Sequence, residues 1–263
     1  MKRSNSKKGC LRSALLIMTA IALCLCAAAV VVEAYFPPLN ASEAEQKVWQ
    51  YAKENGLSYR DYPESLINLL ERNPETEQFV LEYPTASKEV ISIDLSEYTN
   101  CEAVPLLMQW DQRWGYMQYG SDVAGLTACG PVCLSMAAIY LTGNTAYSPD
   151  AMIRFAQENN YYVPGSGSSW TLISEGGQKL GFKVNELPVD ENRIRSCLDA
   201  DIPVVCVVGP GDFTTSGHFL VMTGYENGMI RLNDPNSKAN SQKLWAYADI
   251  KDQIRNLWSI ETP

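Results

Sequence analysis

Apolar residues recur at helical spacing in the middle of the chain. After the loop that ends at Gly130-Pro131, the positions Val132, Met136, Ile139 and Tyr140 lie three or four residues apart, and Gly143 follows. This spacing predicts a helix that begins near Pro131 and ends at Gly143. Three further helices are expected to begin at Ser148–Asp150, Ser168–Trp170 and Asp190–Asn192.

The pattern changes after residue 200, where short apolar runs replace the helical spacing. Ile202–Val208 and Gly217–Tyr225 are typical of buried strands, and Asn227-Gly228 predicts a hairpin turn into a third strand, Met229–Asn233. The segment Trp245–Trp258 is expected to end the chain with a helix or a short strand. Helices grouped before strands predict an α+β fold in which the central helix packs on an antiparallel sheet.

The N-terminal part differs in composition from the rest. Residues 13–32 form an uncharged run of 20, long enough to span a hydrocarbon core of about 30 Å, and five basic residues precede it. This charge bias favours an uncleaved signal anchor with the remainder of the chain outside the cytoplasm. A cleaved signal peptide, which would give a secreted protein, is the alternative.

The predicted organisation has three parts. Residues 1–36 hold the basic tip and the anchor. Residues 37–100 form a helical stalk or extension, and residues 101–263 form the main globular domain. From Ser13 onward, 16 basic residues stand against 30 acidic ones. That excess of acidic residues argues against nucleic acid as a partner.

The cysteines indicate no metal centre. Of eight cysteines, five follow the leader, at positions 101, 129, 133, 197 and 206, and no pair of CxxC motifs occurs. If Cys129 is a free thiol, the other four form zero, one or two disulfides, which the sequence leaves open.

Cys129 is the candidate nucleophile, because it lies at the start of the central helix in Ala128-Cys129-Gly130-Pro131. The positive end of a helix dipole favours the thiolate over the thiol. A small buried cysteine at a helix start is the structural alternative.

His218 is the sole histidine of the sequence, and it lies where a predicted strand begins, after a loop rich in glycine and threonine. An imidazole there can accept the proton of a thiol. Asp234 follows the hairpin and lies near the same strand end, where it can orient the imidazole, whereas the neighbouring Asn233 faces the other side. A structural histidine and an ordinary turn at Asp234-Pro235 are the alternatives.

Acyl transfer also needs donors for the oxyanion. The backbone N–H of Cys129 is one, and Gln109, Gln112 and Gln118 each offer a side-chain amide. The candidate substrate-binding residues are Trp110, in an aromatic stretch, and the three residues that precede His218, namely Thr215, Ser216 and Gly217.

The order of these motifs resembles that of the C39-like cysteine peptidases, which have a papain-like fold. The motifs are a glutamine, Cys-Gly-Pro opening a helix, Gly-His-Phe on a strand, and Asp-Pro about 16 residues later, over residues 104–263. The resemblance implies Cys129 as nucleophile, His218 as general base, Asp234 as its orienter and Gln109 in the oxyanion hole. Gln109 lies 20 residues ahead of Cys129, whereas bacteriocin-processing members keep the glutamine close to the cysteine, so Gln112 and Gln118 stay open.

The sequence therefore predicts an extracytoplasmic thiol peptidase that cleaves peptide bonds through an acyl-enzyme, with a peptide or protein substrate and no cofactor. An acyl transferase using the same site and a catalytically silent binding module of the same fold are the alternatives.

Overall fold

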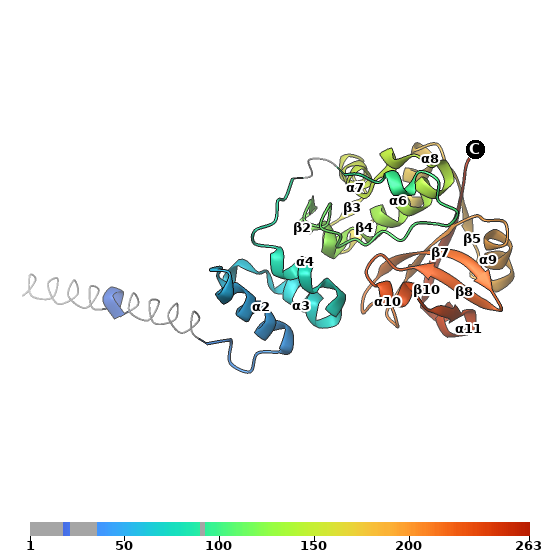
Figure 1. Ribbon diagram of the computed structural model, residues 1–263. Helices are drawn as coiled ribbons and strands as arrows, with labels where there is room; N and C mark the ends of the chain where they lie inside the picture. The colour runs from blue at the N-terminus through green and yellow to red at the C-terminus, as the bar shows by residue number, and fades with distance from the viewer. Residues whose placement is uncertain (1–17, 22–35, 90–92) are drawn as a thin grey trace, which may run out of the picture. The chain divides into compact units, whose positions relative to one another are not determined.

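The computed structural model describes residues 18–21, 36–89 and 93–263 (Figure 1). The predicted anchor, residues 13–32, lies outside the described residues apart from 18–21. In the part of the chain that is described, no helix has both the length and the apolar character needed to cross a membrane. By its internal contacts the chain divides into two compact units, Met1–Arg72 and Asn73–Pro263. The three-part organisation of the sequence analysis stays a prediction.

The first unit contains a helical pair. It consists of α2 (Glu43–Glu54), the short 3-10 helix η1 (Tyr59–Asp61) and α3 (Glu64–Arg72). Ser42 caps α2 in a reciprocal pair with Glu45, which satisfies two backbone donors at the helix start. The buried side chains of α2, including Val48, lie on one face, as the helical spacing predicts.

The second unit begins with η2 (Pro74–Thr76), α4 (Glu77–Glu82) and η3 (Ser96–Tyr98) and continues through a helical region. That region comprises β1 (Gln118–Tyr119), β2 (Asp122–Val123), α5 (Ala124–Thr127), α6 (Cys129–Thr142), η4 (Thr145–Tyr147), α7 (Pro149–Glu158), β3 (Tyr162–Val163), β4 (Gly167–Ser168), η5 (Leu172–Gly176) and α8 (Gly177–Lys179). The rest alternates strands with short helices: β5 (Lys183–Leu187), α9 (Glu191–Leu198), β6 (Val204–Val208), β7 (His218–Glu226), β8 (Met229–Asn233), α10 (Lys238–Ser241), β9 (Leu244–Ala246), α11 (Tyr247–Ile250), η6 (Lys251–Gln253) and β10 (Ile254–Glu261).

Among the described residues, six strands form one sheet in the order β5-β10-β6-β7-β8-β9, and every neighbouring pair is antiparallel. Strand β6 is buried along its whole length. Alternate side chains of β6 and β7 explain this burial: Val205 and Phe219 pack with α6, whereas Cys206 and Leu220 pack with α9 and α11. The sheet is therefore covered on both faces.

Helix α6 is buried on all sides, because every residue from Gly130 to Ile139 is inaccessible to solvent. A helix of this kind is apolar all round, and it packs against β7 and α7. Gly143 ends it in the left-handed conformation at φ 64°, which glycine adopts without steric cost. The predicted α+β fold, with the cysteine-bearing helix packed on an antiparallel sheet, is confirmed.

The chain ends in a strand, one of the two alternatives expected, but the place of this strand in the sheet was not predicted. The final strand β10 lies between β5 and β6 in the interior of the sheet, and it pairs with both. Trp258 and Ile260 of this strand are buried in the core shared with α6. The last segment of the sequence is thus a central structural strand.

Candidate active site

Cys129 is the first residue of α6 and is half-buried. Burial opposes ionisation of its thiol, but a hydrogen bond with His218 and the charge of that residue favour the thiolate. The backbone N–H groups of Phe219 and Gly130 add to this effect, so the pKa of Cys129 falls below its ordinary value of 9.0. The sulfur at this helix start is therefore poised to ionise.

His218 and Asp234 lie at adjacent ends of two neighbouring strands. His218 opens β7, Asp234 directly follows β8, and Nε2 of the imidazole lies 2.7 Å from Oδ1 of the carboxylate. Both side chains are buried, with 8% and 1% of their surface exposed. Because Nε2 is committed to Asp234, Nδ1 is the imidazole nitrogen left for the thiol of Cys129.

The buried histidine and aspartate stabilise each other's charged forms. Burial alone lowers the pKa of His218, but the charge and hydrogen bond of Asp234, together with those of Cys129, raise it to about 10. Burial likewise raises the pKa of Asp234, and the positive imidazolium outweighs it, so the net shift is downward. The imidazolium is therefore the favoured form beside a carboxylate and a thiolate.

The carboxylate of Asp234 is held by the loop that follows it, of which the sequence predicted only the turn at Asp234-Pro235. Its Oδ1 also accepts the backbone N–H of Asn236 at 2.8 Å, and its Oδ2 accepts Nδ2 of Asn240 at 2.8 Å. Ser241 Oγ accepts the backbone N–H of Asp234 at 2.9 Å. Asn240 and Ser241 lie in a polar run that has the composition of an ordinary surface loop, so the sequence gives no sign of their contacts with Asp234. The neighbouring Asn233 instead donates to the carbonyls of residues 104 and 105.

Gln109 connects the cysteine helix with the aspartate loop. Its backbone N–H donates to Pro235 O at 2.7 Å, and its Nε2 donates to Gly125 O at 2.8 Å, four residues before Cys129. The side chain is 3% exposed, and its Oε1 has no hydrogen-bond donor within the described residues.

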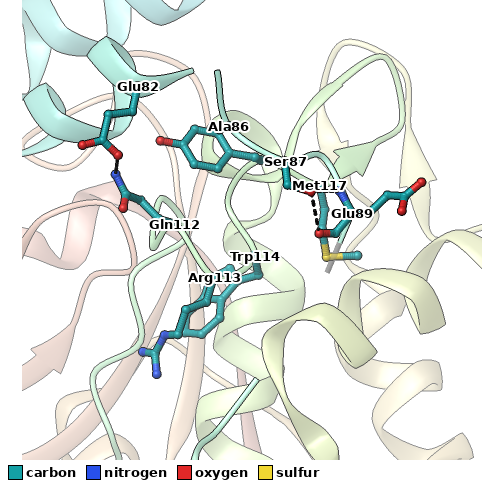
Figure 2. Close-up of a pocket in the computed structure, with 9 residues that line it drawn as sticks. Glu82, Ala86, Ser87, Glu89, Gln112, Arg113, Trp114 and Met117 are labelled. Atoms are coloured by element: carbon teal, nitrogen blue, oxygen red, sulfur yellow. Dashed lines mark hydrogen bonds between the residues drawn. The ribbon is translucent and has the colours of Figure 1, made fainter. Parts of the chain in front are cut away.

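The other two candidate glutamines are exposed and bonded elsewhere. Nε2 of Gln118 donates to Gly120 O, and Nε2 of Gln112 donates to Oε2 of Glu82 at 2.7 Å. Figure 2 shows this second contact at a pocket of about 260 Å³, of which neither Cys129 nor His218 is a lining residue. Of the three glutamines, Gln109 is the one bonded to segments adjoining both Cys129 and Asp234.

The candidate substrate-binding residues fall into two groups. Thr215, Ser216 and Gly217 are exposed in the loop that leads into His218. Trp110 is 9% exposed, and its indole N–H donates to Asn236 O at 2.8 Å, so its ring is part of the packing around the aspartate loop.

A second missed feature is the packing against the turn after the cysteine. A Cβ at Gly130 would lie 2.8 Å from Ser168 Cβ and 3.2 Å from Leu172 Cδ2. The Ser168 hydroxyl in turn lies 2.7 Å from the hydroxyl of the buried Tyr119. Glycine at position 130 therefore allows strand β4 to approach the start of α6 closely.

The five described cysteines are free thiols: Cys101, Cys129, Cys133, Cys197 and Cys206. Burial raises the pKa of the other four thiols, whereas at Cys129 the neighbouring groups outweigh burial and the net shift is downward. Among the described residues, no group of three potential ligands is placed to hold a metal ion. Cys129 is thus the thiol in this set whose ionisation is favoured.

The fold thus brings a helix-borne cysteine near a histidine and an aspartate from neighbouring strands. The model of the Peptidase C39 like family matches residues 101–261, and the chain belongs to this family. A comparison with curated protein sequences found no match.

The solved structures that are similar to this chain include two peptidase domains or C39-like peptidases. The peptidase domain of Streptococcus ComA, a bi-functional ABC transporter involved in quorum sensing, is 17% identical with a TM-score of 0.43, over 61% of this chain and 99% of that domain. A C39-like peptidase from Bacillus anthracis is 15% identical with a TM-score of 0.40, over 64% and 96% of the two chains.

Proposed function

We propose that the protein is a cysteine peptidase in which Cys129, His218 and Asp234 form the catalytic triad. The observation that carries this proposal is the buried 2.7 Å hydrogen bond between His218 and Asp234. The influence of the same imidazole on Cys129, which lowers the pKa of the thiol, supports it. Nucleophile, base and orienting group then have the relative placement that acyl transfer to sulfur requires.

In this mechanism the Cys129 thiolate attacks the carbonyl carbon of a peptide bond. A carbon–sulfur bond forms, and the carbonyl electron pair moves onto oxygen. When this intermediate collapses, the carbon–nitrogen bond breaks and the His218 imidazolium gives its proton to the leaving amine. Water, deprotonated by the neutral imidazole, then attacks the thioester, and the thiolate leaves as the protonated imidazole reforms the ion pair.

Two N–H groups are proposed as the hydrogen-bond donors to the oxyanion of the tetrahedral intermediate. The backbone N–H of Cys129 lies at a helix start, where it has no partner within the helix. The Gln109 amide carries a second N–H beyond the one given to Gly125, and its burial would make a hydrogen bond to a developing charge strong. Gln109→Ala is expected to lower kcat more than it raises KM.

Replacement of Cys129 tests the proposal. Cys129→Ala should abolish cleavage of a peptide library and remove the carboxamidomethyl group that iodoacetamide adds to the peptide containing residue 129. Cys133→Ala, four residues along the same buried helix, is the matched control. This variant should retain both peptide cleavage and the labelling of Cys129. A fully active Cys129→Ala protein would refute the proposal, and products carrying an added amine would identify an acyl transferase instead.

We further propose that residues 13–32 anchor the protein in the membrane with the peptidase domain on the extracytoplasmic side. The uncharged run of 20 residues after a basic tip supports this topology. The protein should then stay in the membrane pellet after alkaline carbonate extraction, and protease added to intact cells should remove the peptidase domain. Release into the supernatant would indicate a cleaved leader.

A further inference from the structure

A glutamate that precedes the matched family region holds the loop that orients Asp234. The carboxylate of Glu75 accepts three hydrogen bonds at the start of α10. Oε2 accepts the backbone N–H of Lys238 at 2.9 Å, and Oε1 accepts the backbone N–H of Ala239 at 3.0 Å and the hydroxyl of Ser237 at 3.1 Å. The family match begins at residue 101. Glu75 therefore lies outside the matched region and still contacts the loop beside the site.

The turn that carries Glu75 is itself fixed to the same loop. Asn73 is 8% exposed, its side-chain amide donates to Asn236 O, and its Oδ1 accepts the backbone N–H of Glu75 at 3.1 Å. Thr76, which is fully buried, donates to Asn73 O at 2.8 Å. Because Asn73 and Thr76 on either side of Glu75 are buried and hydrogen-bonded, the Glu75 carboxylate is presented from a rigid support.

A path of hydrogen bonds leads from Glu75 to the imidazole. The first turn of α10, which Glu75 holds, carries Asn240, and Asn240 donates to Oδ2 of Asp234 at 2.8 Å. The other oxygen of the same carboxylate contacts His218 Nε2 at 2.7 Å. Hydrogen bonds from backbone N–H groups to a carboxylate are charge-assisted, and they are stronger than those between neutral groups.

We propose that Glu75 is a positioning residue for the catalytic triad, which fixes the first turn of α10 and thereby keeps the Asp234 carboxylate aligned with His218. This inference rests on the proposed function. If Glu75 has this role, the segment that precedes the family region at residue 101 contributes to the active site through the loop at residues 236–240. The residue does not touch the reacting atoms.

Loss of this support has a chemical consequence at the thiol. If the loop relaxes, the contact between Asp234 and His218 weakens, and the imidazolium loses part of the charge that stabilises it. A less stable imidazolium makes thiolate formation at Cys129 less favourable. The pH at which the thiolate forms therefore rises, which a loss of folded protein alone would not cause.

The test measures the rate of Cys129 alkylation by iodoacetamide against pH in the full-length chain. In Glu75→Gln, the amide keeps the length of the side chain but places N–H donors against the backbone N–H of Lys238. We expect the midpoint of the profile to rise by about one pH unit, which is an alkylation rate about tenfold lower below that midpoint. Glu75→Asp, which retains the charge, should lie between Glu75→Gln and the wild type. Glu102→Gln, at an exposed glutamate, should match the wild type.

Two reference variants separate the possible failures. His218→Ala and Asp234→Asn should both raise the midpoint if the triad operates as proposed. If both do so while Glu75→Gln and Glu75→Asp keep the wild-type midpoint, the role of Glu75 is overturned and the triad stands. If neither reference variant moves the midpoint, the triad proposal fails, and the role of Glu75 fails with it. If Glu75→Gln does not fold, the Glu75→Asp profile decides, because an unshifted midpoint there overturns the inference.

Discussion

Replacing Gly130 by alanine tests how closely the start of the cysteine helix is packed. The added Cβ would lie 2.8 Å from Ser168 Cβ, 2.9 Å from Ser168 Oγ and 3.2 Å from Leu172 Cδ2. Carbon atoms at their optimal separation are about 3.5–4.0 Å apart, so at least two of these contacts overlap. No positive φ is involved at this glycine, and the effect of the substitution is steric.

The neighbours of Gly130 have little room to move. Ser168 is 6% exposed and its hydroxyl is bonded to that of the fully buried Tyr119, while Leu172 is also fully buried. Overpacking of such a site costs about 1–3 kcal/mol, and the better helix propensity of alanine offsets up to about 1 kcal/mol. We therefore expect a loss of about 1–2 kcal/mol, which lowers the melting temperature by about 2–8 °C for a domain of this size.

A double-mutant cycle measured by thermal and urea denaturation isolates the contact. Ser168→Gly removes both atoms that the new Cβ meets most closely, so Gly130→Ala should cost about 1 kcal/mol less in the Ser168→Gly background than in the wild type. Gly224→Ala is the control, because its Cβ would lie 3.8 Å from the nearest atom, Arg231 Cβ, and its effect should stay within about 0.5 kcal/mol.

Two results would refute this reasoning. One is a Gly130→Ala protein as stable as the wild type. The other is a cycle in which the changes in the free energy of unfolding caused by the two substitutions are additive within about 0.3–0.5 kcal/mol, as they are for sites that do not interact. Either result would mean that β4 and the start of α6 adjust to the added methyl group without strain.

The remaining predictions concern pH and a buried hydroxyl. The proposed mechanism needs the thiolate of Cys129 and the imidazolium of His218. Peptidase activity should therefore rise with pH through the lowered thiol pKa, below 9.0, and fall as pH increases through the imidazolium pKa of about 10. A decline of kcat/KM already at neutral pH would contradict the ion pair. Tyr119→Phe removes the 2.7 Å hydrogen bond to Ser168 and should lower the free energy of unfolding by about 1–2 kcal/mol. An unchanged urea midpoint would show that the hydroxyl pair contributes nothing to stability.

The elements nearest the site could be predicted from the sequence, because their signals are local. Helix α6 has an apolar repeat and a terminal glycine within one segment, and the structure ends it at Thr142 with Gly143 as its cap. The hairpin of β7 and β8 is specified by Asn227-Gly228, both at positive φ. Once the turn is known, the nearly equal spacing of His218 and Asp234 on either side places the two residues at one end of the strands.

The sheet order could not be predicted, because it depends on pairing between distant segments. Strand β5 is mostly exposed and lies at an edge, so it lacks the apolar run of a buried strand. Strand β10 pairs with β5 on one side and with β6 on the other. The paired residues are at least 46 positions apart in the sequence, the smallest separation being that of Ile254 and Val208. The close packing of β4 against α6 also depends on a contact between separate segments. Position 130 requires glycine because a Cβ there would overlap Ser168.

The loop after Asp234 explains why the support of the site was harder to predict than its reacting groups. This loop lies beyond the end of β8 and is not part of the regular strand pairing of the sheet. Its backbone N–H and C=O groups therefore need hydrogen bonds from other segments. Pro235 O accepts the Gln109 backbone N–H, Asn236 O accepts the indole of Trp110, and two backbone N–H groups of α10 are bonded to Glu75. None of these contacts has a local signal, because each joins segments more than 120 residues apart. A substitution at Glu75 should therefore alter the orientation of Asp234, and through it the ionisation of Cys129, although Glu75 does not touch the reacting atoms.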